Sequence, residues 1–90
     1  MRQEKEYREK LEEVLKQIKN YFETAEIRGN DVGSFIFAEK KNRAVEIYQS
    51  KDGVIAEFWE NEEQKTEKEL NSYEKATILV IDRVNSDYEN

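Results

Sequence analysis

A chain of 90 residues makes one domain with a small core, because a domain of this length buries only about 60–65% of the surface that its unfolded chain exposes. Charged residues make up 40% of the sequence and the net charge is −6. Cysteine and histidine are absent, which excludes disulfides, thiolate metal sites and the commonest general base. Seven glutamates lie between Glu57 and Glu74, against Lys65 and Lys68 alone. A nucleic-acid-binding protein shows a basic stripe instead, so we expect no direct binding of nucleic acid.

Both ends of the chain are polar, and we expect residues 1–6 and 85–90 to be frayed tails of a single domain. The first residues lack the apolar segment of a signal peptide. The longest apolar run, Ile78 to Ile81, is far too short to span a bilayer. The sequence therefore predicts a soluble cytoplasmic protein with no membrane partner.

Apolar residues spaced by three and four positions predict an amphipathic helix near the start of the chain. Its stripe contains Tyr7, Leu11, Val14, Ile18, Tyr21 and Ala25. Gly29 and Asn30, residue types that tolerate a left-handed backbone, are expected to end it. The spacing also fits a coiled-coil dimer, but it lasts for fewer than three heptads, which favours a helix that lies on a sheet.

From Phe35 the hydrophobic period changes to two, which predicts strands at residues 35–38, 44–50 and 54–60. Between the last two, Asp52-Gly53 predicts a two-residue type I′ hairpin turn that pairs Gln49 with Ala56. Alternation then places one set of residues toward the core: Val45, Ile47, Val54, Ala56 and Phe58. The opposite face receives Glu46, Tyr48, Ile55, Glu57 and Trp59.

The turn before residue 44 decides which side chains of the first strand face the core. A three-residue loop, Lys40-Lys41-Asn42, with Asn42 in the left-handed region suits this sequence. It places Phe35 and Phe37 on the core face, so Ile36 and Ala38 join Trp59 on the opposite face.

The segment from Glu62 to Leu70 has no clear period, and it reads either as an edge strand from Gln64 to Leu70 or as a loop. Asn71, followed three positions later by Glu74, then predicts a capped helix from Tyr73 to Asn85. The expected fold is an α+β two-layer domain, α-β-β-β-(β)-α, in which both helices cover one face of a three- or four-stranded antiparallel meander.

No segment carries a catalytic or cofactor-binding motif. The serines have no histidine to activate them, and no glycine-rich phosphate loop is present. Pairs of carboxylates arise by chance among 21 acidic residues, and the acidic run 61–69 lacks the spacing of a calcium loop. We therefore expect no enzyme, no cofactor and no metal site.

The sheet face opposite the helices is the strongest candidate for a functional surface. It would expose Ile36, Tyr48, Ile55 and Trp59 among carboxylates, and contiguous apolar patches are unusual on the free surface of a monomer. Alternatively, Trp59 folds over the sheet edge onto the 62–70 segment and covers this patch. A bulge between Ala56 and Trp59 would instead turn Trp59 inward.

These features favour a small acidic protein-binding module that docks on a basic protein. The expected contact residues are Ile36, Glu46, Tyr48, Ile55, Glu57, Trp59, Glu60, Glu62, Glu63, Glu67 and Glu69. Size and charge are typical of inhibitors such as immunity proteins, antitoxins and phage-encoded inhibitors of host defence, and the acidic region 57–74 would mimic nucleic acid. The alternative is a structural homo-oligomer, such as a homodimer, paired through this face or through the first helix. No stretch resembles a specific family.

Overall fold

The computed structural model describes residues 2–29, 33–84 and 86, with the backbone alone for residues 2–6 and 65. Helix α1 (Arg2–Ile18) is followed by a short 3-10 helix, η1 (Lys19–Tyr21), by five strands and by a final helix. The strands and the final helix are β1 (Thr24–Gly29), β2 (Ser34–Lys40), β3 (Arg43–Gln49), β4 (Val54–Glu60), β5 (Glu63–Leu70) and α2 (Tyr73–Val84). The backbone of residues 2–6 belongs to α1, whereas residues 1, 85 and 87–90 lie outside the described residues, so the fraying of the tails stays a prediction.

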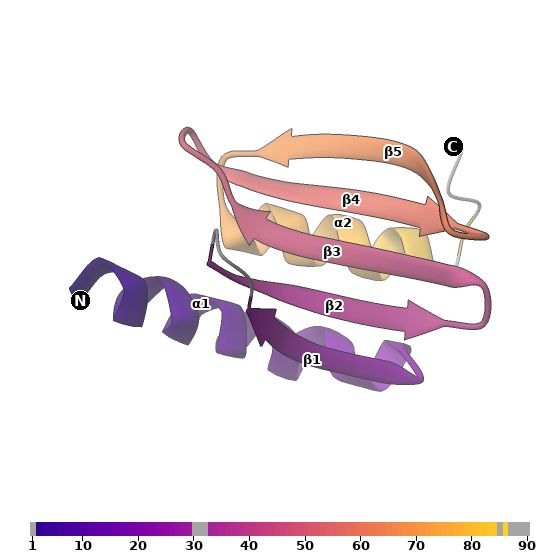
Figure 1. The fold of residues 1–90 in the computed structure, drawn as a ribbon, viewed down its shortest axis with the longest axis horizontal. Helices are drawn as coiled ribbons and strands as arrows, with labels where there is room; N and C mark the ends of the chain where they lie inside the picture. Colours follow the sequence, from indigo (N-terminus) through magenta and orange to yellow (C-terminus); the bar gives the residue numbers. More distant parts are fainter. Residues whose placement is uncertain (1, 30–32, 85, 87–90) are drawn as a thin grey trace.

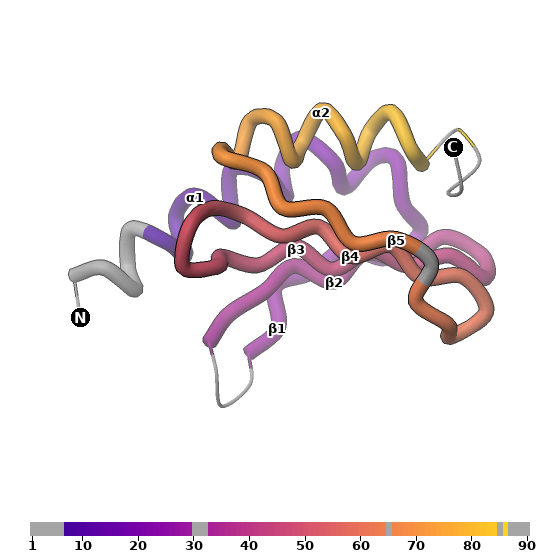
Figure 2. Tube along the Cα trace, turned by 90° about the horizontal axis from the view of Figure 1, so that it is seen from above, coloured from indigo at the N-terminus to yellow at the C-terminus, as the bar shows by residue number. Residues whose placement is uncertain are grey.

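The strands form one antiparallel sheet in the order β1-β2-β3-β4-β5 (Figure 1). Figure 2 shows both helices on the same side of this sheet. The predicted two-layer α+β meander is therefore confirmed, and it has five strands instead of three or four. No helix among the described residues is long and apolar enough to cross a membrane.

Strand β1 corrects the prediction that the first helix continues to Gly29. The α-helix ends at Ile18, and Phe22 is already extended, with φ −123° and ψ 157°. Ala25 had fitted the helical spacing, but it also alternates with Ile27 at the period of a strand. Ala25 and Ile27 lie opposite Ala38 and Ile36 of β2, so the backbone groups of this segment pair with the sheet.

The face assignment of β2 was wrong, because its turn to β3 contains two residues instead of three. Lys40 pairs with Arg43, and Lys41 takes the left-handed conformation with φ 56°. A change of one residue in register moves every side chain of a strand to the other face. Ile36 and Ala38 are consequently fully buried, whereas Phe35 and Phe37 lie on the side away from the helices.

The hairpin between β3 and β4 differs from the predicted two-residue type I′ turn. Gln49 pairs with Val54, and a four-residue loop closes with the Ser50 N–H donating to the carbonyl oxygen of Gly53 at 2.8 Å. The pairing is shifted by two residues from the predicted one, which leaves both face assignments of β3 and β4 unchanged. Phe58 is 1% exposed on the core side, as expected.

The segment after Glu62 forms the edge strand β5, so the loop interpretation is excluded. A bulge interrupts the pairing of β4 with β5 at Phe58 and Trp59, and the extra residue lies on β5. Pairing with β3 remains regular, so Trp59 is not turned inward. At the start of α2 the cap is Ser72 rather than Asn71: its Oγ accepts a hydrogen bond from the Lys75 N–H at 3.2 Å.

The core fills the space between the helices and the near face of the sheet. Its buried hydrophobic residues are Leu11, Val14, Ile18, Phe22, Ile36, Ala38, Val45, Ile47, Val54, Ala56, Phe58, Ala76, Val80 and Val84. Tyr7 fastens α1 to the sheet, because its hydroxyl donates to the Ser34 carbonyl and accepts the Gln49 N–H at 3.2 Å. All of this packing lies on one side of the sheet and leaves the other side without a covering helix (Figure 2).

Candidate functional site

The side of the sheet away from the helices is the candidate site, and we call its side chains the outer face. Pairing and alternation arrange them in three rows that run from β1 to β5. The rows are Arg28, Phe35, Tyr48, Ile55 and Glu69; Glu26, Phe37, Glu46, Glu57 and Glu67; and Thr24, Glu39, Ala44, Trp59 and Gln64. The fifteen side chains of these rows include six glutamates and one arginine, which gives the three rows a net charge of −5.

The middle row brings three carboxyl groups together from adjacent strands: Glu46, Glu57 and Glu67. Burial, followed by the charge of Glu57, raises the pKa of Glu46 above its ordinary value despite the attraction of Arg28. A hydrogen bond with Glu57 is the main cause that raises the pKa of Glu67. These carboxyl groups therefore repel one another when ionised, and a cation placed above them would relieve that repulsion.

Tyr48 adds a hydroxyl to this row. The Tyr48 hydroxyl donates to Oε1 of Glu57. Burial and the neighbouring carboxylates raise the pKa of Tyr48, so the phenol stays protonated and keeps its role as a donor. Within the described part of the chain, no group of three or more acidic side chains is arranged to hold a metal ion.

The outer face contains one guanidinium group of the chain itself, that of Arg28. The guanidinium carbon of Arg28 lies 4.0 Å from the centre of the Phe37 ring, and Arg28 Nε is 2.5 Å from Oε2 of Glu26. The planar cation is thus held by an aromatic ring and a carboxylate at once, which is the favoured environment for arginine.

Trp59 borders a depression on the outer face and is half-buried. In its row it lies between Ala44 of β3 and Gln64 of β5. Its indole nitrogen is buried and has no hydrogen-bond partner within the described residues. The depression is lined by Phe37, Glu39, Lys41, Asn42, Ala44, Glu46, Trp59, Asn61 and Glu62. Trp59 is therefore neither a core residue nor a fully exposed one.

The structure brings most of the predicted contact residues onto one surface. Seven lie on the outer face: Glu46, Tyr48, Ile55, Glu57, Trp59, Glu67 and Glu69. Ile36 does not, because it is fully buried beneath the helices, and its assignment to this surface was wrong. Glu62 lies in the β4–β5 turn beside the depression, and Glu60 pairs with Glu63 on the other side of the sheet.

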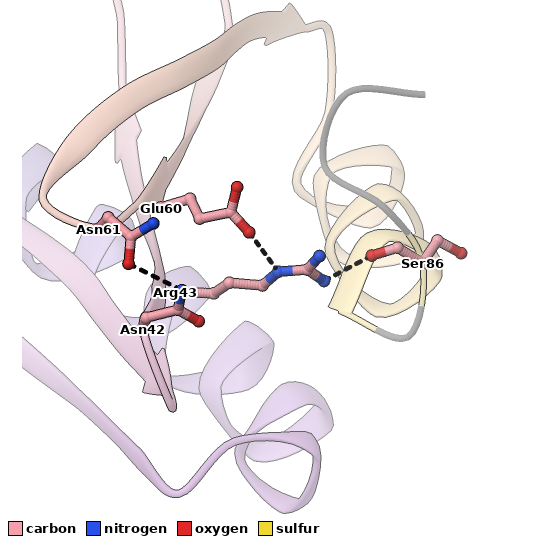
Figure 3. Close-up of polar contacts among 5 residues, drawn as sticks. All are labelled: Asn42, Arg43, Glu60, Asn61 and Ser86. Carbon is pink, nitrogen blue, oxygen red and sulfur yellow. Dashed lines mark hydrogen bonds and ion pairs between the residues drawn. The ribbon is translucent and has the colours of Figure 1, made fainter.

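Glu60 instead belongs to a structural clamp at one end of the sheet (Figure 3). Arg43 donates through Nε to Oε2 of Glu60 at 3.1 Å and through Nη1 to the Ser86 carbonyl oxygen at 2.6 Å. Asn42 Nδ2 donates to Oδ1 of Asn61 at 2.8 Å. These contacts join the β2–β3 turn, the β4–β5 turn and the chain after α2, so Glu60 has a role within the fold.

Sequence reasoning missed several residues of the outer face, among them Glu26, Arg28, Phe35, Phe37 and Glu39. The alternation of residues 24–28 was a signal for β1, and it was obscured because Ala25 also fitted the helical spacing. Phe35 and Phe37 were missed because the length of the β2–β3 turn decides the face of β2.

Comparison of the chain with known protein families, curated proteins and solved structures finds no match. The functional argument therefore depends on the geometry of the outer face.

Proposed function

We propose that this protein is a non-enzymatic binding module whose outer face docks on a basic protein. The observation that supports the proposal is the composition of this uncovered face, where half-buried aromatic side chains stand among six glutamates. Aromatic side chains are enriched at the energetic centres of interfaces. The carboxylates suit a positively charged partner, because opposite charges accelerate the encounter.

Within this class we favour an inhibitor of the immunity, antitoxin or anti-defence type, which occupies a basic functional surface of its partner. Mimicry of nucleic acid by the continuous region 57–74 has less support than mimicry by the outer face as a whole. The sheet places Glu57 and Glu67 on this face, but directs Glu60 and Glu63 to the other side. If the outer face mimics nucleic acid, glutamates from all five strands take the places of the phosphate groups.

The alternative of a homo-oligomer paired through the outer face is disfavoured by charge. It would bring together two copies of the three rows, each with six glutamates and one arginine. Sedimentation velocity in low salt, at increasing protein concentration, is expected to show a monomer throughout. A dimer that forms under these conditions would favour the structural alternative.

Charge reversal with a matched control tests the proposal. Glu39→Lys/Glu67→Lys reverses two carboxylates of the outer face, and Glu9→Lys/Glu13→Lys reverses two exposed carboxylates of α1, so the net charge changes equally in both variants. Tagged wild type and both variants are used for capture from native lysate. Each captured protein is then identified, purified and titrated.

We expect a basic partner that the α1 variant binds like wild type and that the outer-face variant binds at least about tenfold more weakly, with a loss that diminishes at high salt. The proposal fails if no basic protein is captured, or if both variants bind the partner equally well.

A further inference from the structure

We propose that the depression above Ala44 is a binding site for one arginine side chain of the partner. This inference deepens the proposed function and depends on it. It assigns to the outer face a specific subsite, which is defined by Phe37, Glu39, Ala44, Glu46 and Trp59.

The positions of these residues on adjacent strands create the space. Ala44 lies on β3, with Glu39 opposite it on β2 and Trp59 opposite it on β4. Neighbouring strands are roughly 4.8 Å apart, so the backbones of β2 and β4 are about 10 Å apart across the small alanine side chain. In the next row, Phe37 and Glu46 close one end of the depression. The result is a site with an apolar floor, aromatic side chains and three carboxylates, those of Glu39, Glu46 and Glu62. Lys41 also lines the depression, so the three carboxylates outnumber its one cation.

This combination of groups selects a guanidinium. Arginine presents a planar and weakly hydrated cation that stacks on aromatic rings and donates paired hydrogen bonds to carboxylates. Lysine carries a compact, strongly hydrated charge that makes less use of the aromatic walls. Arg28 shows the same recognition within the chain, since it contacts Phe37 at 4.0 Å and Glu26 at 2.5 Å.

Neither Glu39 nor Glu46 is held in an ion pair among the described residues, although the charge of Arg28 attracts Glu46. The ion pairs found among the described residues involve Glu12, Glu26 and Glu60, and they leave out Glu39 and Glu46. Glu39 is exposed, whereas Glu46 is partly buried next to Glu57. An arginine in the depression would place its charge between Glu39 and Glu46 and would offset the repulsion between Glu46 and Glu57.

Short peptides test this site without the natural partner. Acetyl-Gly-Arg-Gly-amide, its lysine counterpart and its citrulline counterpart are each titrated into ¹⁵N-labelled protein in low salt. We expect saturable shifts of the Trp59 indole N–H and of the Ala44 and Glu46 amides with the arginine peptide. The lysine and citrulline peptides should bind at least about fivefold more weakly, because one cannot stack as well and the other has no charge.

Two variants locate the binding. Ala44→Leu fills the floor of the depression, and Glu39→Gln removes one carboxylate without adding bulk. Each should weaken binding of the arginine peptide at least about fivefold, whereas Glu13→Gln, on the exposed surface of α1, should leave it unchanged. Amide spectra confirm that each variant is folded.

The inference is overturned if citrulline binds as tightly as arginine, if the shifts cluster on α1 or α2, or if Ala44→Leu has no effect. Those outcomes leave the proposed function standing when Glu39→Lys/Glu67→Lys still weakens binding of the basic partner at least about tenfold. If that charge reversal leaves capture unchanged, the proposed function itself fails.

Discussion

Among the three glycines, Gly53 is the one at which an added side chain would meet other atoms of the protein. A Cβ atom at this position would lie 2.2 Å from the carbonyl oxygen of Leu70, which is a backbone atom of the neighbouring strand β5. Its N–H also donates to Oγ of Ser50 at 3.0 Å and holds the β3–β4 loop closed. The glycine is therefore required by the close approach of two backbone segments.

Gly53→Ala is expected to lower the free energy of unfolding by about 2 kcal/mol or more, because the β3–β4 loop must move away from β5. For a domain of this size the melting temperature would fall by about 8–16 °C. Gly29→Ala is the matched control, since an added Cβ there meets nothing within 4 Å. Equal melting temperatures of the two variants in thermal denaturation would contradict the close approach.

At the scale of the elements, the β2–β3 turn decides which side chains of β2 reach the core. Lys40 pairs with Arg43 across two turn residues, and this register buries Ala38 while it exposes Glu39. The turn is braced from both sides: the Lys41 N–H donates to Oε1 of Glu23 at 2.8 Å, and Asn42 bonds Asn61. The register is thus held by contacts from outside the hairpin.

Charged substitutions at adjacent positions of β2 test this register. Ala38→Lys would place an ammonium group in a site that is 0% exposed, and we expect it to unfold the domain. Glu39→Lys should leave the melting temperature within a few degrees of wild type, because its side chain is exposed. If the β2–β3 turn had three residues, Glu39 would face the core, and Glu39→Lys would destabilise the domain more than Ala38→Lys. Circular dichroism melts of both variants therefore decide between the two registers.

At the scale of the whole molecule, the negative charge is unevenly distributed between the two sides of the sheet. The outer face carries six glutamates within the described strands, and the pKa values of Glu46 and Glu67 are raised. A carboxyl group whose pKa is higher in the folded state destabilises the fold when it is ionised. Its unfavourable contribution is present at neutral pH and is relieved as the pH falls through the raised pKa toward the ordinary value of 4.5.

Glu57→Gln removes the central charge of this row, while its amide oxygen can still accept the hydrogen bond from Tyr48. We expect the melting temperature to rise by roughly 2–4 °C at pH 7. The difference from wild type should shrink as the pH falls through the raised pKa values, because protonation then removes the same repulsion. Thermal melts of both proteins from pH 7 down to pH 4 measure this difference in melting temperature.

Glu13→Gln, on the exposed surface of α1, makes the same change in net charge and should have a smaller effect. A stabilisation that is equal in both variants, or independent of pH, would show that the row on the outer face is not its source.

The parts of the fold that were predicted correctly are those that depend on the local spacing of apolar residues. The 3.6-residue period of α1 and α2, and the alternation of residues 45–48 and 54–59, predicted the elements and the faces of β3 and β4. These two faces contain Glu46, Tyr48, Ile55, Glu57 and Trp59 of the outer face. The sequence missed β1 and inverted β2, so it omitted Phe37 and Arg28 and wrongly included Ile36.

Amino-acid periodicity by itself determined the two-layer α+β architecture, because an amphipathic helix and an alternating strand each have one apolar side to bury. It also placed Phe58 and Trp59 on opposite sides of the sheet, and this held although the hairpin register was shifted by two residues. Only the tertiary structure decided the face of β2 and the depression above Ala44. These depend on the length of one turn and on the pairing of distant strands, and contacts between segments remote in the sequence select them.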